Sequence, residues 1–186
     1  SEIAGGELFY NDGLRSVAKM INYGLIYGMS AFRLSRELEI PMRDAQRYID
    51  SYFTRYPQVK KYLEMSVDEA RVSGCSKTLF GRQLPILGIN SPDSSRKDAA
   101  ERMALNAPIQ GTAADIMKIA MKKIYHKLKQ EYPTARIVLQ VHDELVIEVF
   151  EKDASMVSKI VEEEMIRAAS LVVPLEVNIS IGASWG

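Results

Sequence analysis

Cysteine, histidine and tryptophan are scarce in this sequence, which has one Cys, two His and one Trp among 186 residues. The lone Cys75 excludes an intramolecular disulfide and a cysteine-cluster metal site. Neither charge is in excess, since 24 Lys and Arg balance 24 Asp and Glu. The overall charge therefore does not indicate a nucleic-acid partner, and any phosphate site must be a local feature.

Long apolar runs are also lacking, because no stretch approaches the roughly 20 apolar residues of a membrane span. The N-terminus has no basic and then apolar signal-peptide pattern. We therefore expect a soluble, unsecreted protein without a membrane partner. With 47% hydrophobic residues, the chain can bury a core as one domain or as two small lobes. Residues 1–12 have weak periodicity, so we expect a frayed start of a segment cut from a longer protein.

The first half of the chain has the spacing of helices. Apolar residues recur on one face from Leu14 to Tyr27. The punctuation by Gly and Pro predicts further helices at about 30–39, 41–56 and 59–72. Between 74 and 93, Gly, Pro, Asn and Ser multiply, which predicts an irregular or hairpin-like excursion.

A helix is expected to return near Ser95 and to be interrupted at Pro108. Thr112 with Asp115 resembles a capping box, which predicts a new helix start and a long amphipathic helix to about Lys129.

The pattern after Pro133 changes to alternation. It predicts a hairpin at 136–150 with a polar tip, a helix at 154–169 and a closing strand at 175–181. The expected fold class is therefore α+β, with a mostly helical first part followed by a small antiparallel sheet and flanking helices.

A polar ridge is predicted on the first helix, opposite its apolar stripe. Arg15, Lys19, Tyr23 and Tyr27 follow one another at i, i+4 steps, and no acid occurs from 13 to 36. At ~1.5 Å per residue the ridge is roughly 18 Å long, comparable to a nucleoside triphosphate. Arg and Lys suit phosphates, and tyrosine rings suit sugar and base. The alternative is that both cations are solvated and the tyrosines pack on a neighbouring helix.

A second series, Arg102, Asn106 and Gln110, is also spaced by four. These donors can reach the acceptors that every base pair shows in the minor groove. Pro108 predicts that the three cannot share one undisturbed helix. Alternatively, the two amides cap the helix break.

The hairpin tip carries His142, Asp143 and Glu144. Two-metal phosphoryl transfer needs acidic ligands that hold two ions about 3.5–4 Å apart. Asp143 is the candidate ligand, and Glu144 would point to the other face of a regular strand and act indirectly. The alternative is an ordinary solvated turn.

Three strings resemble motifs of DNA polymerase I type (family A) DNA polymerases, in the family order. RSVAKMINYGLIYGMS resembles the B motif, ERMALNAPIQGTAAD a primer and template contact, and QVHDELVIEV motif C. The resemblance runs from Arg15 to Trp185 through SYFTRYP and TLFGRQ. It implies a fingers-like region at 1–94 and a partial palm at 95–186. Gln83 and Cys75 depart from the residues frequent in the family.

The resemblance implies roles for the ridge. Arg15 and Lys19 would contact the incoming triphosphate, with Lys19 the candidate acid for the departing pyrophosphate. Tyr23 would lie against the sugar, Tyr27 at the insertion site, and Gly28 would permit close approach. Many members have Phe in place of Tyr23, whose hydroxyl can stand in for a missing sugar 3′-hydroxyl, so we expect dideoxy terminators to be accepted more readily.

The other motifs acquire implied roles in the same way. Arg102, Asn106 and Gln110 would contact primer and template, with Tyr27 beside the template base. His142 would lie at the primer terminus beside the nucleotide.

The remaining implied partners are primer-template DNA, deoxynucleoside triphosphates and the rest of the polymerase chain. No string resembles motif A (DYSQIELR), which supplies the family's other metal-binding aspartate, and the thumb is missing as well. The complete enzyme would use two Mg²⁺ ions, with Asp143 and Glu144 among its catalytic residues. This chain alone would be inactive, and we do not expect it to bind both Mg²⁺ ions. The expected location is the cytoplasm of a bacterial or phage-infected cell, and an organelle is left open. The alternative is a non-catalytic nucleotide-binding or nucleic-acid-binding module, or one half of a split polymerase.

Overall fold

The structure is a computed structural model, which describes residues 12–185. The chain divides into two compact units, Ser1–Gly111 and Thr112–Gly186. The lead-in expected at the start of the chain lies, except for its last residue, outside the described residues. None of the helices in the described part is long and apolar enough to cross a membrane.

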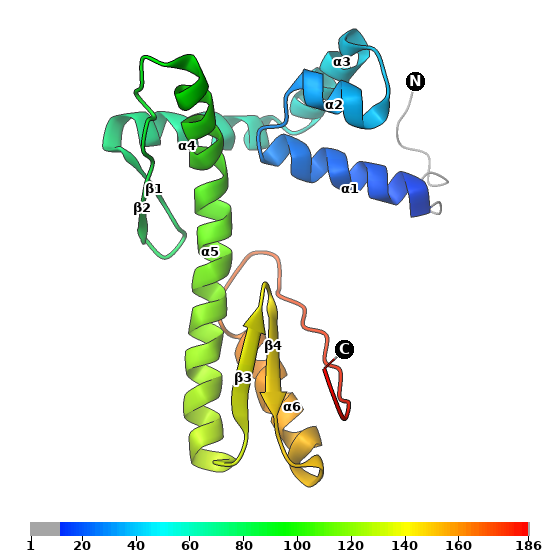
Figure 1. Cartoon of the computed structure of the whole chain (residues 1–186), viewed down its shortest axis with the longest axis vertical. Coiled ribbons are helices and arrows are strands. Elements are labelled where there is room, and N and C mark those ends of the chain that lie inside the picture. Colours follow the sequence, from blue (N-terminus) through cyan, green and yellow to red (C-terminus); the bar gives the residue numbers. More distant parts are fainter. Residues whose placement is uncertain (1–11, 186) are drawn as a thin grey trace. The chain divides into compact units, whose positions relative to one another are not determined.

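Four helices open the first unit (Figure 1). They are α1 Asp12–Ile26, α2 Ala31–Leu38, α3 Met42–Arg55 and α4 Pro57–Ser73. The caps explain their ends. The Ser30 hydroxyl accepts a hydrogen bond from the Arg33 N–H at the start of α2, and Pro57 is the first residue of α4. Gly74 ends α4 in the left-handed conformation, with φ 71°. The predicted helices are therefore confirmed.

The excursion after α4 is a short antiparallel hairpin. Its strands are β1 Cys75–Lys77 and β2 Gln83–Pro85, with Ser76 paired to Leu84. In the first unit the hairpin lies beside α5, as Figure 1 shows. A buried cluster joins α4, the segment after β2 and α5: Ala70, Ile86, Ile89, Ala100 and Ala104.

Helix α5 corrects one prediction. It runs without interruption over Ser94–Glu131, 38 residues, with Pro108 inside it. The break expected at Pro108 is therefore wrong. So is the capping box at Thr112 and Asp115, because both residues lie in the interior of the helix.

The physical reason is a side chain that is distant in sequence. Pro108 has no N–H to donate to the Ala104 carbonyl, which a residue four positions earlier would normally receive. The buried Ser76 hydroxyl of β1 donates to that carbonyl instead, at 3.3 Å. A buried acceptor that keeps a donor costs the helix little, so the helix continues through the proline.

The second unit holds the predicted tip hairpin and one further helix. Its elements are β3 Arg136–Val141, β4 Glu144–Glu148, the 3₁₀ turn η2 Glu151–Asp153 and α6 Ala154–Ile166. In Figure 1 the hairpin lies beside the C-terminal half of α5, and α6 packs against them. The core joins all three: Ala120, Ile124, Leu128, Ala135, Val157, Ile160, Val161 and Ala168, with Ile137, Leu145 and Ile147 packed against it. The α+β class is confirmed.

The closing strand expected at 175–181 is not formed. The alternation is present in the first part of the segment, where Leu175 and Val177 are half-buried while Glu176 and Asn178 are exposed. It does not continue, because Ile179 and Ile181 are exposed. A strand also needs a hydrogen-bonded partner, however, and β3 and β4 pair only with each other within the described part of the chain. Alternation alone therefore predicted an extended segment but not a sheet.

Candidate functional site

The ridge on α1 is a continuous line from cation to aromatic ring. The Lys19 Nζ atom lies 5.8 Å from the centroid of the Tyr23 ring. The rings of Tyr23 and Tyr27 stack with centroids 6.5 Å apart and an interplanar angle of 21°. Tyr27 follows the last residue of α1, and its N–H donates to the Tyr23 carbonyl at 3.0 Å. The i, i+4 series thus places a positive charge at one end and a flat aromatic surface at the other.

The cations of this ridge are open to a ligand. Arg15 and Lys19 are exposed. Among the residues whose side chains the structure describes, neither Arg15 nor Lys19 takes part in an ion pair, and the first pair along the chain joins Arg33 and Glu37 at 3.6 Å. Tyr23 is 52% exposed, so about half of its surface is open to a ligand. An anion with an attached planar group fits such a surface.

Gly28 brings the aromatic end of the ridge to α5. Its φ is 77°, a conformation that L side chains rarely adopt. A Cβ atom there would lie 3.1 Å from the Leu105 Cδ1 and 3.5 Å from the Arg102 Cγ. The turn after α1 therefore runs close to the start of the second polar series.

The second series shares a single helix, contrary to the expectation from Pro108. Arg102, Asn106 and Gln110 all lie within α5, where a spacing of four puts them on one face. Arg102 and Gln110 are exposed, and Asn106 is half-buried. The Asn106 Oδ1 is buried without a hydrogen-bond partner among the described residues. A buried acceptor without a donor costs about 1–3 kcal/mol.

The tip of the second unit presents exposed acidic side chains. His142 and Asp143 form the loop between β3 and β4, and Glu144 begins β4 opposite Val141. His142 has a φ of 51°, and the Gln140 Nε2 donates to its carbonyl at 2.6 Å. A non-glycine residue in this region is strained, and such strain clusters at functional sites. The turn fixes the backbone position of Asp143 and leaves its side chain exposed.

The two acidic residues at the tip are suited to provide some of the ligands of a metal ion. Carboxylate oxygens are the ligands that Mg²⁺ prefers, and Asp143 and Glu144 are both exposed. The described residues contain no group of three or more His, Cys, Asp or Glu side chains close enough to hold an ion. Asp143 and Glu144 can therefore supply part of a ligand set at most.

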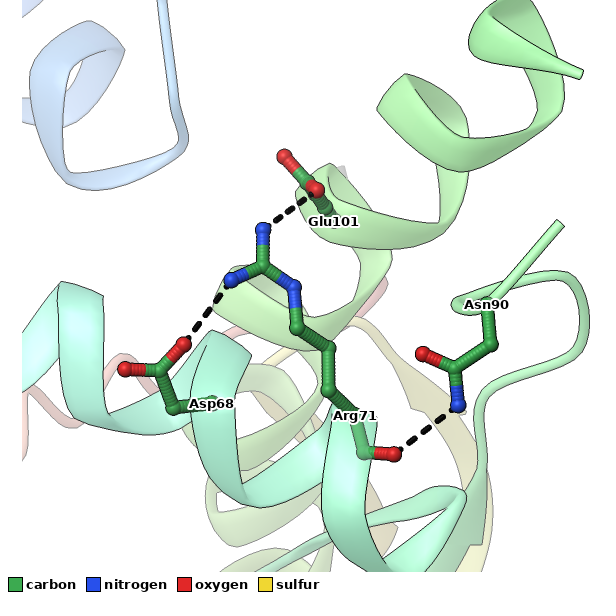
Figure 2. A network of polar contacts seen from close by, with 4 residues as sticks. All are labelled: Asp68, Arg71, Asn90 and Glu101. Carbon is green, nitrogen blue, oxygen red and sulfur yellow. Dashed lines mark hydrogen bonds and ion pairs between the residues drawn. The ribbon is translucent and has the colours of Figure 1, made fainter. Parts of the chain in front are cut away.

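A polar network that the sequence patterns did not indicate joins Asp68, Arg71, Asn90 and Glu101 (Figure 2). The Arg71 guanidinium bonds Asp68 at 2.9 Å and Glu101 at 2.7 Å. The Asn90 amide donates to the Arg71 carbonyl at 2.9 Å. The hydrogen bond with Glu101 is the main cause that raises the pKa of Arg71, and burial acts in the opposite direction. The network connects three parts of the chain: α4, α5 and the segment that follows β2. Arg71 and Glu101 are 30 residues apart, and no local sequence pattern indicates a pair at that separation.

Residues 8–186 match the family model described as DNA polymerase family A. The chain belongs to this family, as the resemblance of its three motifs predicted.

Its relatives are DNA polymerases I. The chain is 46% identical over 172 residues to the DNA polymerase I of Caldicellulosiruptor bescii and to the thermostable DNA polymerase I of Thermus aquaticus. Each match covers 92% of this chain but 20% of the relative, so the chain spans about a fifth of the length of these curated relatives. A solved structure, the POL domain of Pol1 from M. smegmatis in complex with DNA primer-template and dNTP, superposes with a TM-score of 0.85 at 42% identity. That match covers 89% of this chain and 29% of the other.

Proposed function

We propose that this chain is the nucleotide-holding and primer-holding part of a DNA-directed DNA polymerase, which adds deoxynucleotides to a primer 3′ end by two-metal phosphoryl transfer. The observation that carries the proposal is the open ridge of α1, where Lys19, Tyr23 and Tyr27 align. The DNA primer-template and dNTP of the related POL domain support it.

In this proposal the ridge binds the incoming nucleotide. Arg15 and Lys19 hold the triphosphate, and the Lys19 ammonium donates a proton to the departing pyrophosphate. Tyr23 lies against the sugar, and Tyr27 stacks at the insertion site beside the template base. Gly28 keeps the turn close to α5.

The other two motifs hold the primer end. Arg102, Asn106 and Gln110 contact primer and template through minor-groove acceptors, and His142 contacts the primer terminus and the nucleotide. Asp143 ligates metal, and Glu144 supports it indirectly. When bound, two Mg²⁺ ions would stabilise the attacking and leaving oxygens.

The proposal extends to the arrangement of the whole protein. Residues 1–94 are a fingers-like region and 95–186 part of a palm, while the motif A aspartate and the thumb come from other parts of the polymerase. These 186 residues alone are therefore inactive, because one motif C carboxylate cannot hold both ions. Since the relatives named above are bacterial enzymes, we propose the cytoplasm of a bacterial or phage-infected cell as the location.

The test is primer extension with Mg²⁺ and four deoxynucleotides, comparing this chain alone with the chain plus a separately made piece that carries motif A. Extension in the mixture only is the expected result. Lys19→Met should then slow extension about 100-fold, the lower range for loss of a general acid, whereas Lys122→Met on the exposed face of α5 should not.

Other outcomes separate the alternatives. Extension by the chain alone would show that its site is complete. If neither sample extends although both pieces are folded and associated, the chain is a binding module for nucleotides or nucleic acid.

A further inference from the structure

The inner face of the β1–β2 hairpin is pressed against α5. Ser76 and Thr78 are both 5% exposed, and the half-buried Leu84 is the strand partner of Ser76. A Cβ atom on Gly111 of α5 would lie 2.8 Å from the Thr78 Cγ2 and 2.8 Å from the Leu84 Cδ1. The hairpin therefore lies directly on the backbone of α5 at Gly111, with no room for a side chain between them.

Two polar contacts fasten the same hairpin to backbone carbonyls of α5. The Ser76 Oγ donates to the Ala104 carbonyl at 3.3 Å. The Arg82 Nη2 donates to the Gly111 carbonyl at 3.0 Å. The turn that presents Arg82 is itself fixed, because the Arg82 N–H donates to the Thr78 Oγ1 at 3.1 Å and the Thr78 N–H donates to the Arg82 carbonyl at 3.0 Å.

The two contacts stand on either side of Pro108. The contacts lie at Ala104 and Gly111, seven residues apart along α5. Between them, Pro108 lacks the N–H that would donate to the Ala104 carbonyl, and the hairpin supplies a donor to that carbonyl instead. Asn106 and Gln110 lie between the two contact points, on the helical turns that the proline would otherwise weaken.

We propose that the β1–β2 hairpin is a positioning clip, in which Ser76 and Arg82 keep α5 helical across Pro108 and thereby set the spacing of Asn106 and Gln110. The importance of this spacing rests on the proposed function, in which Asn106 and Gln110 contact primer and template. Ser76 and Arg82 act through the helix, and neither is proposed to touch substrate.

The first experiment tests the clip by itself, in the polymerase that contains this chain. Hydrogen exchange of the α5 amides at 106, 107 and 109–112 is measured for Ser76→Ala, Pro108→Ala and the double variant. We expect about tenfold faster exchange in Ser76→Ala, the order of effect of a buried carbonyl without a donor. In the Pro108→Ala background the restored N–H of residue 108 serves Ala104, so removal of the Ser76 hydroxyl should have no such effect.

Ser66→Ala is the matched control, because that hydroxyl donates to the Tyr62 carbonyl of its own helix at 2.9 Å. Equal effects of Ser76→Ala in both backgrounds, or no effect in either, would overturn the clip.

The second experiment tests what the clip positions. Primer-template and deoxynucleotide affinities are measured on the same variants. We expect Ser76→Ala to weaken primer-template binding about tenfold, the order of one lost hydrogen-bonding side chain, with nucleotide affinity unchanged and recovery in the Pro108→Ala background. A parallel loss of both affinities, or no loss of primer-template affinity despite faster exchange, would overturn the positioning role. If the unmodified polymerase bound no primer-template, the proposed function would fail, while the exchange result would still decide the clip.

Discussion

At the scale of single residues, the Tyr23 side chain offers the sharpest test of the ridge. This side chain is 52% exposed. We predict that Tyr23→Phe, in the polymerase that contains this chain, lowers the use of dideoxynucleotides relative to deoxynucleotides about tenfold or more, because the phenol can replace the absent 3′-hydroxyl as a hydrogen-bonding group.

The measurement is the ratio of kcat/KM for the two nucleotide types. Tyr125→Phe, which changes a similarly exposed tyrosine on α5, should leave this ratio unaltered. An unchanged ratio in Tyr23→Phe would refute the sugar contact.

The sequence predicts the residues of the ridge well, because i, i+4 spacing converts directly into alignment on a helix. Lys19, Tyr23 and Tyr27 lie in line as predicted. It does not predict the Arg71 pair with Glu101, since two surface charges 30 residues apart resemble any other solvated charges. Nor does it predict that the Asn106 oxygen is buried without a hydrogen-bond partner among the described residues.

At the scale of elements, Gly111 shows how close the hairpin and α5 must be. Gly111→Ala should destabilise the protein by roughly 1–2 kcal/mol, although alanine favours a helix over glycine by about 1 kcal/mol. The reason is overpacking in the upper part of its usual range, about 2–3 kcal/mol, because the new methyl would meet two atoms at once, the Thr78 Cγ2 and the Leu84 Cδ1, each at 2.8 Å. Chemical denaturation measures the change.

A second substitution tests the cause. Thr78→Ser removes the methyl but keeps the hydroxyl that accepts from the Arg82 N–H, so it should recover part of the stability that Gly111→Ala loses. An alanine variant as stable as the parent would contradict the close approach.

The elements themselves were largely predictable, and the exception is instructive. The punctuation by Gly and Pro predicted the helix ends correctly, and the caps that the structure shows at Ser30 and Gly74 act within one turn. Pro108 and the Thr112 and Asp115 pair look like a helix break by the same local rules. The hydroxyl that supports the helix comes from Ser76, 28 residues earlier, and local patterns contain no trace of it.

At the scale of the molecule, each unit has its own buried cluster. Ile124 is 0% exposed in the core of the second unit. We predict that Ile124→Ala costs about 2–5 kcal/mol and that amides of β3, β4 and α6 lose hydrogen-exchange protection while those of α2 and α3 keep theirs.

Lys122→Ala is the control, because Lys122 is exposed and lies two positions from the core residues Ala120 and Ile124. This change should alter the stability by no more than about 0.5 kcal/mol. Equal loss of protection in α2 and α3 would show that the two clusters unfold as one.

The fold class followed from the change of period after Pro133, which separates a helical part from a hairpin. The segment at 175–181 shows the limit of that reasoning. Its alternation is present in the burial of Leu175 and Val177, but a sheet is a relation between segments, and one sequence window cannot specify its partner.

The bond from the Ser76 hydroxyl to the Ala104 carbonyl also has an evolutionary consequence. A lineage that replaces Pro108 regains a backbone donor and releases Ser76 from selection, whereas one that loses Ser76 first must tolerate an orphaned carbonyl. The two positions should therefore change in a preferred order among homologues, with the proline lost before the serine.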